Sequence, residues 1–455
     1  MNAELCGARL LAPVFGSSLY VWASVMGITL LALALGYFFG GYISVKPKEQ
    51  HRLFTILNIA ALFVVLMPIT SYYLIPFLSY LPFLLAVVIS TLLLLFLPVF
   101  FLGASSPLFI FIQTEKLEQS GRISGTVYAV STAGGILATF LCGFYLIPEI
   151  GLKACLTIFG LLLFVGNYLV FKVIKTSYSF FLLGLLYLNY SVISHKSPGI
   201  CESEGILGRV EVSDIVNGNG DSIRLLKLNR IVQTEVDKKT NESVSEYVKV
   251  LDSIVPASKK PLKALILGLG GGVTANLFSK KNYVSDCVEF DERILNAAKS
   301  YFHLPHDANL IHADARTFIN GTSKKYDLVL VDLFKAEEQP AHVITKESLE
   351  KLKTCLNDSA LLLINWHGYL SSAMGSGTSI MYETLVQSGF EIKLFATGKN
   401  EHYRNVIFAV SFDKLKKINC FFAINEKPLP TSIINTDDKP VLENHNAVAN
   451  MSWRK

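Results

Sequence analysis

Residues 262–272 read LKALILGLGGG. The first six residues are mostly apolar and predict a buried strand, and the glycines that follow permit a tight turn into a helix at 273–279. Strand and helix patterns continue to alternate downstream. Further strands are expected at 285–290, 309–313, 326–331 and 361–365. Strands that alternate with helices predict a Rossmann-like, doubly wound α/β domain with a mostly parallel sheet.

Acidic residues follow the carboxyl ends of three successive strands. Glu289 and Asp291 end the second strand, Asp314 with Ala315 follows the third, and Asp332 follows the fourth. Ligands of doubly wound sheets bind at this edge, where the acid after the second strand can accept from both ribose hydroxyls. The acid after the third strand can accept from an adenine amino group. These acids and the glycine turn, which lets the backbone approach a ligand closely, predict a nucleoside site. The candidate glycines are Gly268, Gly270 and Gly272.

Residues 206–235 alternate apolar and polar side chains around the sequence NGNGD at 217–221. Turn residues between two alternating runs predict a β-hairpin. A helix that contains Tyr247 and is closed by Pro256 is expected next. The predicted domains are a hairpin subdomain with its linking helix, an α/β domain and a C-terminal tail. Their ranges are 198–260, 261–425 and 426–455.

Long uncharged runs dominate the chain up to about residue 195. A bilayer-spanning helix needs roughly 20 mostly apolar residues. Candidate spans are centred on 18–43, 53–75, 80–112, 127–148, 152–172 and 178–194. Residues 1–197 are therefore predicted to form a transmembrane helical bundle. In this bundle Pro98 should kink the third span, and Ala32, Gly36 and Gly40 should form a face for close helix packing.

Basic residues recur in alternate loops, after the first, third and fifth spans. They include Lys46, Lys116 and Lys172. The positive-inside rule places these loops in the cytoplasm. Because 178–194 is short, we expect it to lie on the membrane surface or to re-enter, which leaves the α/β domain cytoplasmic. The chain is thus expected to be an integral protein of an inner or plasma membrane, with membrane lipid as a partner.

Composition excludes several other classes of protein. The net charge is +5, and no basic cluster with interleaved aromatic residues is present, which argues against nucleic-acid binding. The seven cysteines are scattered without a Cys-x-x-Cys pair, which argues against a disulfide framework or a zinc site. The spans carry almost no charge, which disfavours a transporter.

With these motifs, residues 203–370 resemble the spermidine synthase family. The matching stretches are NRIVQ at 229–233, EY at 246–247, the glycine turn, VEFD at 288–291, ADA at 313–315 and YDLVLVD at 326–332. The membrane half resembles the helical region fused to some members of this family, at RLLAP (9–13), GYFFGG (36–41) and residues 126–148. In those relatives another helix usually precedes the RLLAP stretch, so the natural start is expected upstream.

The resemblance implies transfer of an aminopropyl group from decarboxylated S-adenosylmethionine to a small-molecule amine. Methylthioadenosine is released, and neither a metal nor a permanently bound cofactor takes part. By position, Gln233 and Tyr247 would line the pocket, Glu289 would bind ribose and Asp314 adenine. Asp332 would take the proton from the attacking amine. Whether the chain forms a homodimer is left open by the resemblance.

Two departures from the family pattern bear on the substrates. The fourth position of the glycine turn, usually an acid, is Gly271, and the second acid usually found after the catalytic one is replaced by Lys335. The amine acceptor is therefore open. Lys335 could instead bind the carboxylate of intact S-adenosylmethionine, for aminocarboxypropyl transfer or for cyclisation or cleavage of the nucleoside itself. A methyltransferase, which uses the same type of sheet, and a non-catalytic nucleoside sensor are further alternatives.

Overall fold

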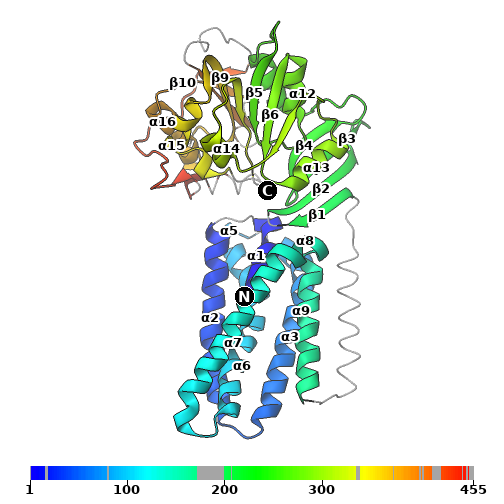
Figure 1. The fold of residues 1–455 in the computed structure, drawn as a ribbon, viewed down its shortest axis with the longest axis vertical. Coiled ribbons are helices and arrows are strands. Elements are labelled where there is room, and N and C mark those ends of the chain that lie inside the picture. Colours follow the sequence, from blue (N-terminus) through cyan, green and yellow to red (C-terminus); the bar gives the residue numbers. More distant parts are fainter. Residues whose placement is uncertain are drawn as a thin grey trace. The chain divides into compact units, whose positions relative to one another are not determined.

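A computed structural model describes most of the chain. The described residues are 2–15, 19–78, 81–171, 199–205, 207–334, 339–371, 373–398, 401, 404–411, 422–442, 444–446 and 449. The chain divides into a helical unit, Met1–Pro198 with Ser203–Gly208, and an α/β unit, Gly199–Glu202 with Arg209–Lys455 (Figure 1).

Mostly apolar helices of different lengths build the helical unit. They are α1 (Asn2–Phe15), α2 (Leu19–Ser44), α3 (Glu49–Tyr73), α4 (Ile75–Leu78), α5 (Phe83–Thr91), α6 (Leu97–Gln113), α7 (Ser120–Leu141), α8 (Ile147–Ile150) and α9 (Leu152–Phe171). Five segments are long and apolar enough to cross a membrane, namely Tyr20–Ser44, Glu49–Tyr73, Leu84–Gln113, Leu117–Leu146 and Leu152–Leu169. They correspond to the first five predicted spans. The sixth, 178–194, lies outside the described residues.

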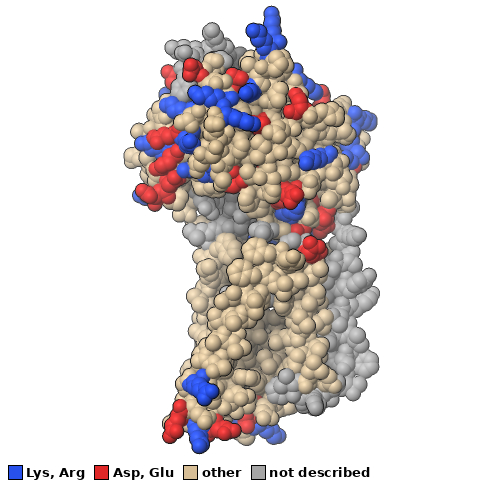
Figure 2. All heavy atoms as spheres, viewed as in Figure 1, with Lys and Arg blue, Asp and Glu red and all other residues tan. Residues whose placement is uncertain are grey.

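The third and fourth spans are not regular α-helices throughout. A π-helical turn at Leu92–Phe96 separates α5 from α6, directly before Pro98. A second π-helical turn, Cys142–Leu146, follows α7. π-helical turns and prolines interrupt the regular hydrogen-bond ladder of a helix, so the expected irregularity near Pro98 is present. On the face drawn in Figure 2, charged side chains of the helical unit are absent from its middle, as a lipid-facing surface requires.

Small residues bring α2 and α6 into backbone contact. A Cβ atom added at Gly40 would lie 2.8 Å from the Ala104 Cα atom, and one at Gly36 would lie 3.1 Å from the Ala104 nitrogen. Ala32, one turn earlier on α2, is completely buried. The predicted small-residue face is therefore a helix-packing surface, which needs residues without bulky side chains.

A four-stranded sheet precedes the larger sheet along the chain, and its strands β2, β3 and β4 pair in antiparallel fashion. Its strands, in spatial order, are β1 (Gly199–Gly205), β2 (Gly208–Val216), β3 (Ser222–Leu228) and β4 (Ile231–Asp237). The predicted hairpin is β2–β3, which pairs Val216 with Ser222 across the NGNGD turn. Strands β1 and β4 extend that hairpin on either side. Helix α11 (Glu246–Ile254) then leads into the larger sheet.

Eight strands form the larger sheet, in the order β12-β10-β11-β9-β8-β5-β6-β7. The parallel part contains β5 (Leu262–Leu267), β6 (Tyr283–Glu289), β7 (Asn309–His312), β8 (Tyr326–Val331) and β9 (Leu356–His367). Strands β10 (Glu391–Ala396), β11 (Asn405–Ser411) and β12 (Ala423–Ile424) add an antiparallel edge. The sheet is thus mixed: the parallel strands extend from β9 in its middle to β7 at one edge, and the antiparallel strands form the other side.

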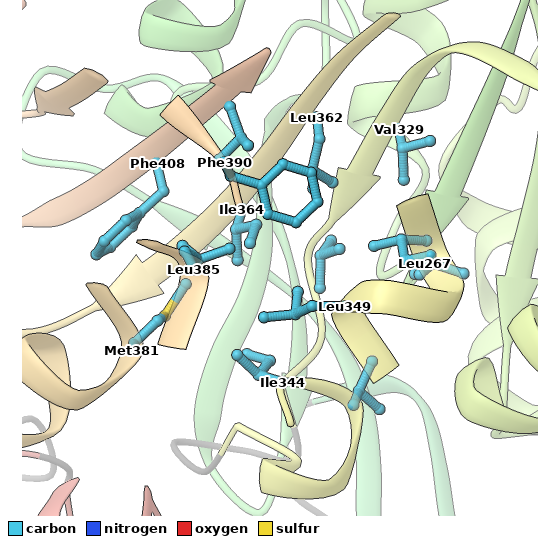
Figure 3. Close-up of a cluster of buried hydrophobic side chains, with 14 of the residues drawn as sticks. Leu267, Val329, Ile344, Leu349, Leu362, Ile364, Met381, Leu385, Phe390 and Phe408 are labelled. Atoms are coloured by element: carbon cyan, nitrogen blue, oxygen red, sulfur yellow. The ribbon is translucent and has the colours of Figure 1, made fainter. Parts of the chain in front are cut away.

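Helices cover both faces of this sheet. They are α12 (Val273–Lys280), α13 (Glu292–Tyr301), α14 (Ala315–Gly321), α15 (Lys346–Lys353) and α16 (Ser376–Gln387). Alternate residues of β5 point to opposite faces: Leu265 and Leu267 pack with α14, α15 and α16, whereas Ala264 and Ile266 pack with α11, α12 and α13. Figure 3 shows the first of these cores, where Leu267 and Val329 lie near Leu349. Because helices cover both faces of the sheet, residues on both sides of a central strand are buried, which explains the nearly continuous apolar runs in the sequence.

The described part of residues 426–455, assigned to a tail in the sequence, contributes to the α/β core. Asn435 is completely buried, and its Nδ2 atom donates to the carbonyl oxygens of Ala341 (3.0 Å) and Ile344 (2.8 Å). Leu442 is also buried in the core between the sheet and α15 and α16. This part of the chain therefore anchors the segment 341–344.

Candidate active site

Three side chains from different elements meet at the carboxyl end of β8. Asp332 directly follows β8, and its Oδ2 atom accepts a hydrogen bond from the Tyr247 hydroxyl of α11 (3.2 Å). Its Oδ1 atom accepts from Nδ2 of Asn365 on β9 (2.8 Å). The Oδ1 atom of Asn365 accepts in turn from Nδ2 of Asn405 on β11 (2.9 Å), which fixes the orientation of the Asn365 amide. The carboxylate is thus held from both sides while it stays partly accessible.

The surroundings of Asp332 suit a general base. Burial raises the pKa of this carboxyl to about 6, although the hydrogen bonds from Asn365 and Tyr247 act in the opposite direction. Burial, with the nearby Asp332 charge, raises the pKa of Tyr247 well above its usual value, so the phenol stays a donor. Burial lowers the pKa of His367 to about 3, which leaves this last residue of β9 neutral. A base whose pKa lies near the working pH is the kind that catalysis requires.

The glycine turn after β5 packs tightly against the protein. Gly268, Gly270 and Gly272 all have positive φ angles (90°, 53° and 75°), which glycine adopts without strain. A Cβ atom at Gly268 would overlap the carbonyl oxygen of Asp332, so this glycine allows the glycine turn and the backbone of Asp332 to approach closely. A Cβ atom at Gly270 would lie 3.9 Å from the carbonyl oxygen of Gln233, so β4 brings Gln233 to the turn.

The position of the missing acid, Gly271, is already filled by its neighbours. The Thr234 hydroxyl of β4 accepts a hydrogen bond from the Gly271 nitrogen (2.8 Å). A Cβ atom at residue 271 would lie 2.7 Å from Thr234 Cγ2 and 2.9 Å from Phe302 Cδ1. A side chain there would force both neighbours to move, so the turn as folded has no room for one. The other departure, Lys335, lies outside the described residues.

Glu289 ends β6 and binds backbone groups on both sides. Its side chain is only 9% exposed, and its two oxygens accept from the nitrogens of Leu269 (3.1 Å) and Asp291 (3.0 Å). Burial raises the pKa of this carboxyl, while those N–H groups oppose the rise. Glu289 therefore fastens the glycine turn to β6. Each carboxylate oxygen can accept a further hydrogen bond, which leaves capacity for ribose hydroxyls.

Asp291 and Asp314 each begin a helix. The Asp291 carboxylate accepts from the backbone nitrogen of Arg293 (3.0 Å) and pairs with its guanidinium (2.9 Å), which caps α13. Asp314 accepts from the Thr317 nitrogen (2.8 Å) and caps α14, where Ala315 is buried at the first position. These contacts are local and structural, so they explain the presence of both acids without a ligand.

Asp314 retains an accessible carboxylate despite its capping role. Its Oδ2 atom lies 3.5 Å from Nε2 of His342, and its side chain is 34% exposed. Burial acts to raise the pKa of Asp314, but the hydrogen bonds from Thr317 and His342 outweigh it and hold the pKa below its usual value. The ionised side chain can therefore accept a hydrogen bond from an amino group.

Sequence reasoning missed Asn365, which binds Asp332, and the two polar residues that bind Asn365, namely Gln339 and Asn405. Asn365 is 3% exposed and stands two residues before His367 at the end of β9, the strand next to β8. Its position near the carboxyl end of a predicted strand was the feature of the sequence that could have identified it as a site residue. Trp366, which follows it, points away into the core and donates to the Thr378 hydroxyl (2.9 Å). Within the described part of the chain, no group of three or more His, Cys, Asp or Glu residues could hold a metal ion.

Comparison with known proteins identifies the domain. Residues 241–368 match the family model of the spermine/spermidine synthase domain. The chain is 29% identical over 157 residues to the polyamine aminopropyltransferase of Vibrio vulnificus (strain CMCP6), which covers 32% of this chain and 51% of that protein. It is 30% identical over 129 residues to the polyamine aminopropyltransferase of Saccharolobus solfataricus, covering 26% of this chain and 43% of that protein. The chain thus spans about half or less of the length of these curated relatives.

Other similar proteins include a methyltransferase and a solved synthase. The N-terminal histidine N-methyltransferase of Emericella nidulans is 30% identical over 122 residues, which covers 26% of this chain and 22% of that protein. The spermidine synthase structure from Thermotoga maritima aligns with a TM-score of 0.38 and 16% identity, covering 55% of this chain and 88% of that one. The domain match at residues 241–368 contains Tyr247, Glu289, Asp314, Asp332 and Asn365. Residues 241–368 of this chain therefore match the spermine/spermidine synthase domain, and the curated relatives similar to the chain include polyamine aminopropyltransferases.

Proposed function

We propose that this chain is a membrane-bound transferase that moves an aminopropyl-type group from an S-adenosyl nucleoside to an amine. The observation that carries the proposal is the Asp332 carboxylate, held by Tyr247 and Asn365 at the end of β8 and beside the glycine turn. The polyamine aminopropyltransferases that resemble this domain support the reaction class.

The proposed reaction is a single displacement. The lone pair of a neutral amine nitrogen attacks the methylene carbon bound to the sulfonium sulfur of the donor. The carbon–sulfur bond breaks, its electron pair stays on sulfur, and methylthioadenosine leaves. The new ammonium group loses a proton to Asp332, which must be ionised to accept it. Glu289 would hold ribose and Asp314 the adenine amino group, with Gln233 near the glycine turn.

A product assay tests this proposal. The purified full chain is incubated with decarboxylated S-adenosylmethionine or with S-adenosylmethionine, each with and without a panel of amines, and the products are identified by mass spectrometry. We expect amine-dependent release of methylthioadenosine. Release without an added amine would indicate cyclisation or cleavage of the donor, and transfer of an aminocarboxypropyl group would assign the carboxylated donor.

The same assay separates a second candidate function. The histidine N-methyltransferase that resembles 122 residues of this chain favours methyl transfer as the alternative. That reaction would produce S-adenosylhomocysteine from S-adenosylmethionine and no methylthioadenosine. If the chain binds a nucleoside but forms no product, the result would support a non-catalytic nucleoside sensor and contradict the proposed transferase.

We further propose that the α/β unit lies in the cytoplasm, where S-adenosyl nucleosides are made. Basic residues in alternate loops of the helical unit, such as Lys46 between α2 and α3 and Lys116 between α6 and α7, support this orientation. A phosphatase that is active only outside the cytoplasm, fused after Lys455, should stay inactive, while a cytoplasmic fluorescent reporter at the same place should fluoresce. The reverse pattern would place the unit outside.

A further inference from the structure

The turn between β2 and β3 carries two Asn-Gly pairs, and a third pair ends α14. The pairs are Asn217-Gly218, Asn219-Gly220 and Asn320-Gly321. An asparagine followed by glycine readily loses its side-chain amide without an enzyme, because glycine has no side chain to shield its backbone nitrogen. The reaction needs a mobile asparagine side chain and a free N–H on the glycine. Hydrogen bonds of the folded chain therefore decide which pair can react.

The side chain of Asn217 is held in place by the turn. Its Oδ1 atom accepts from the nitrogens of Asn219 (3.0 Å) and Asp221 (2.8 Å), and its Nδ2 atom donates to Oδ2 of Asp221 (3.2 Å). Asparagine side chains commonly bind the backbone of a turn in this way. The side-chain carbonyl carbon of Asn217 cannot turn towards the Gly218 nitrogen until these contacts are lost. The first pair is therefore protected at its asparagine.

Helix α14 protects the third pair. Asn320 and Gly321 are the last residues of this helix, and the nitrogen of Thr322, which follows them, still donates to the Phe318 carbonyl oxygen (2.9 Å). Within a helix, backbone N–H groups donate to the carbonyl four residues earlier, and the backbone keeps one conformation. An attack by the Gly321 nitrogen on the Asn320 side chain would require the last turn to unwind.

Asn219 has much less protection. Asn219 and Gly220 are both exposed, and no described residue forms a hydrogen bond with the Asn219 side chain. The Gly220 nitrogen donates to the carbonyl oxygen of Asn217 (3.0 Å). This single bond lies in an exposed turn, where water can replace the lost partner, so opening it costs little free energy. The reactive groups of the second pair can therefore meet while the rest of the chain stays folded.

We propose that Asn219 is the site at which this protein spontaneously deamidates, and that folding protects Asn217 and Asn320. The Gly220 nitrogen gives its proton to water, and its lone pair attacks the side-chain carbonyl carbon of Asn219. A carbon–nitrogen bond closes a cyclic imide, the bond to Nδ2 breaks, and the nitrogen takes up a proton and leaves as ammonia. Water then opens the ring at either carbonyl group, which yields aspartate or isoaspartate.

Either product alters the tip of the hairpin. Both place a new carboxylate close to Asp221 in the sequence, and like charges so close repel each other. Isoaspartate also routes the main chain through the former side chain and so lengthens it. The longer chain no longer matches the backbone bonds of Asn217 with Gly220 (3.0 Å) and Asp221 (2.9 Å). The turn is therefore expected to loosen as the protein ages.

Peptide mapping by mass spectrometry tests this assignment without reference to any activity. The purified full chain is incubated at mildly alkaline pH, which favours loss of the Gly220 proton, and samples are digested with trypsin at intervals. One tryptic peptide, residues 210–224, contains both turn asparagines, and its fragment ions assign the added mass to one of them. Asn219 should convert at least about tenfold faster than Asn217 or Asn320, because one exposed hydrogen bond opposes its reaction. In urea, where these contacts are lost, the three rates should become similar.

Two variants complete the experiment. Asn219→Ser removes the reactive amide and should leave the peptide at its original mass. Asp221→Ala removes the carboxylate that holds Nδ2 of Asn217 and should speed the conversion of Asn217 by about threefold or more. An unchanged rate at Asn217 in that variant would refute the protective role of its side-chain contacts.

The inference fails if folded wild-type chain converts Asn217 or Asn320 as fast as Asn219. It also fails if Asn219 stays intact in the folded chain while the chain in urea converts it. The same ranking of rates with and without urea would show that neighbouring residues in the sequence, and not the hydrogen bonds of the fold, set the preference.

Discussion

Replacing Asp332 with asparagine should lower turnover by about 100-fold or more, the usual contribution of a positioned general base. The variant keeps the size and shape of the side chain but cannot take the proton from the attacking amine. Methylthioadenosine affinity should not change, because the nucleoside is assigned to Glu289 and Asp314. Single-turnover release of methylthioadenosine, with calorimetry on the same samples, measures both quantities.

The matched control is Asp327→Asn. Asp327 is a carboxylate on the same strand, but it binds the Lys263 nitrogen (3.0 Å) and Asn357 (2.8 Å) away from the carboxyl end. Its replacement should leave turnover within about twofold. An Asp332→Asn enzyme with wild-type turnover would refute the assignment of the base.

The pH profile provides an independent check on the same base. Since the pKa of Asp332 is raised to about 6, the fraction of ionised base should fall about tenfold for each pH unit below that value. The raised pKa also means that ionising this group disfavours folding. This effect is absent below the ordinary pKa and grows until the pH reaches about 6. Asp332→Asn should remove the contribution of this carboxyl both to the pH dependence of turnover and to the pH dependence of the free energy of unfolding, which denaturation measures.

The second large effect is expected at Glu289. Glu289→Ala should weaken methylthioadenosine binding by about 1.5–3 kcal/mol, the range for a hydrogen bond to a charged group, and calorimetry measures it directly. Part of the loss arises because the Leu269 nitrogen loses its partner and the glycine turn loosens. Glu289→Gln, which retains one carbonyl oxygen, should lose less.

Glu292→Ala is the control for this experiment. Glu292 lies three residues further on, in the first turn of α13, and is exposed. It should bind methylthioadenosine like the wild type. If Glu289→Ala also binds with unchanged affinity, Glu289 belongs to the turn alone and not to the nucleoside site.

Local patterns predicted the strand-end positions of the candidate residues well. The apolar runs before Gly268 and Asp332 became β5 and β8, which are covered on both faces. The strand expected before Glu289 became β6, although it also carries Ser285 and Asp286. The strand expected at 361–365 is longer, Leu356–His367. It starts opposite Tyr326, and its more polar first half lies at an irregularity in the register between Tyr326 and Leu328 of β8. The sequence therefore located the edge of the sheet at which Asp332 lies.

Local sequence patterns could not predict the contacts between segments that are far apart in the chain. The antiparallel strands β10–β12 and the burial of Asn435 depend on pairings between distant segments, which local periodicity does not encode. The capping roles of Asp291 and Asp314 were also missed, although an acid directly before a helix is a common cap. These acids looked purely functional because only their place after a strand was considered.

The sequence by itself determined two properties of this protein. The first is an apolar half, of whose six predicted spans the first five correspond to helices long enough to cross a membrane. The second is the order of glycine turn and strand-end acids that resembles the spermidine synthase family. Both depend on the order of residues within short windows, where hydrophobicity and backbone freedom act locally. Only the tertiary structure decided the setting of Asp332. Tyr247 and Asn365 are 85 and 33 residues away along the chain, yet their hydrogen bonds position the carboxylate. Its raised pKa comes from burial, which exists only once the sheet and α11 enclose the strand end.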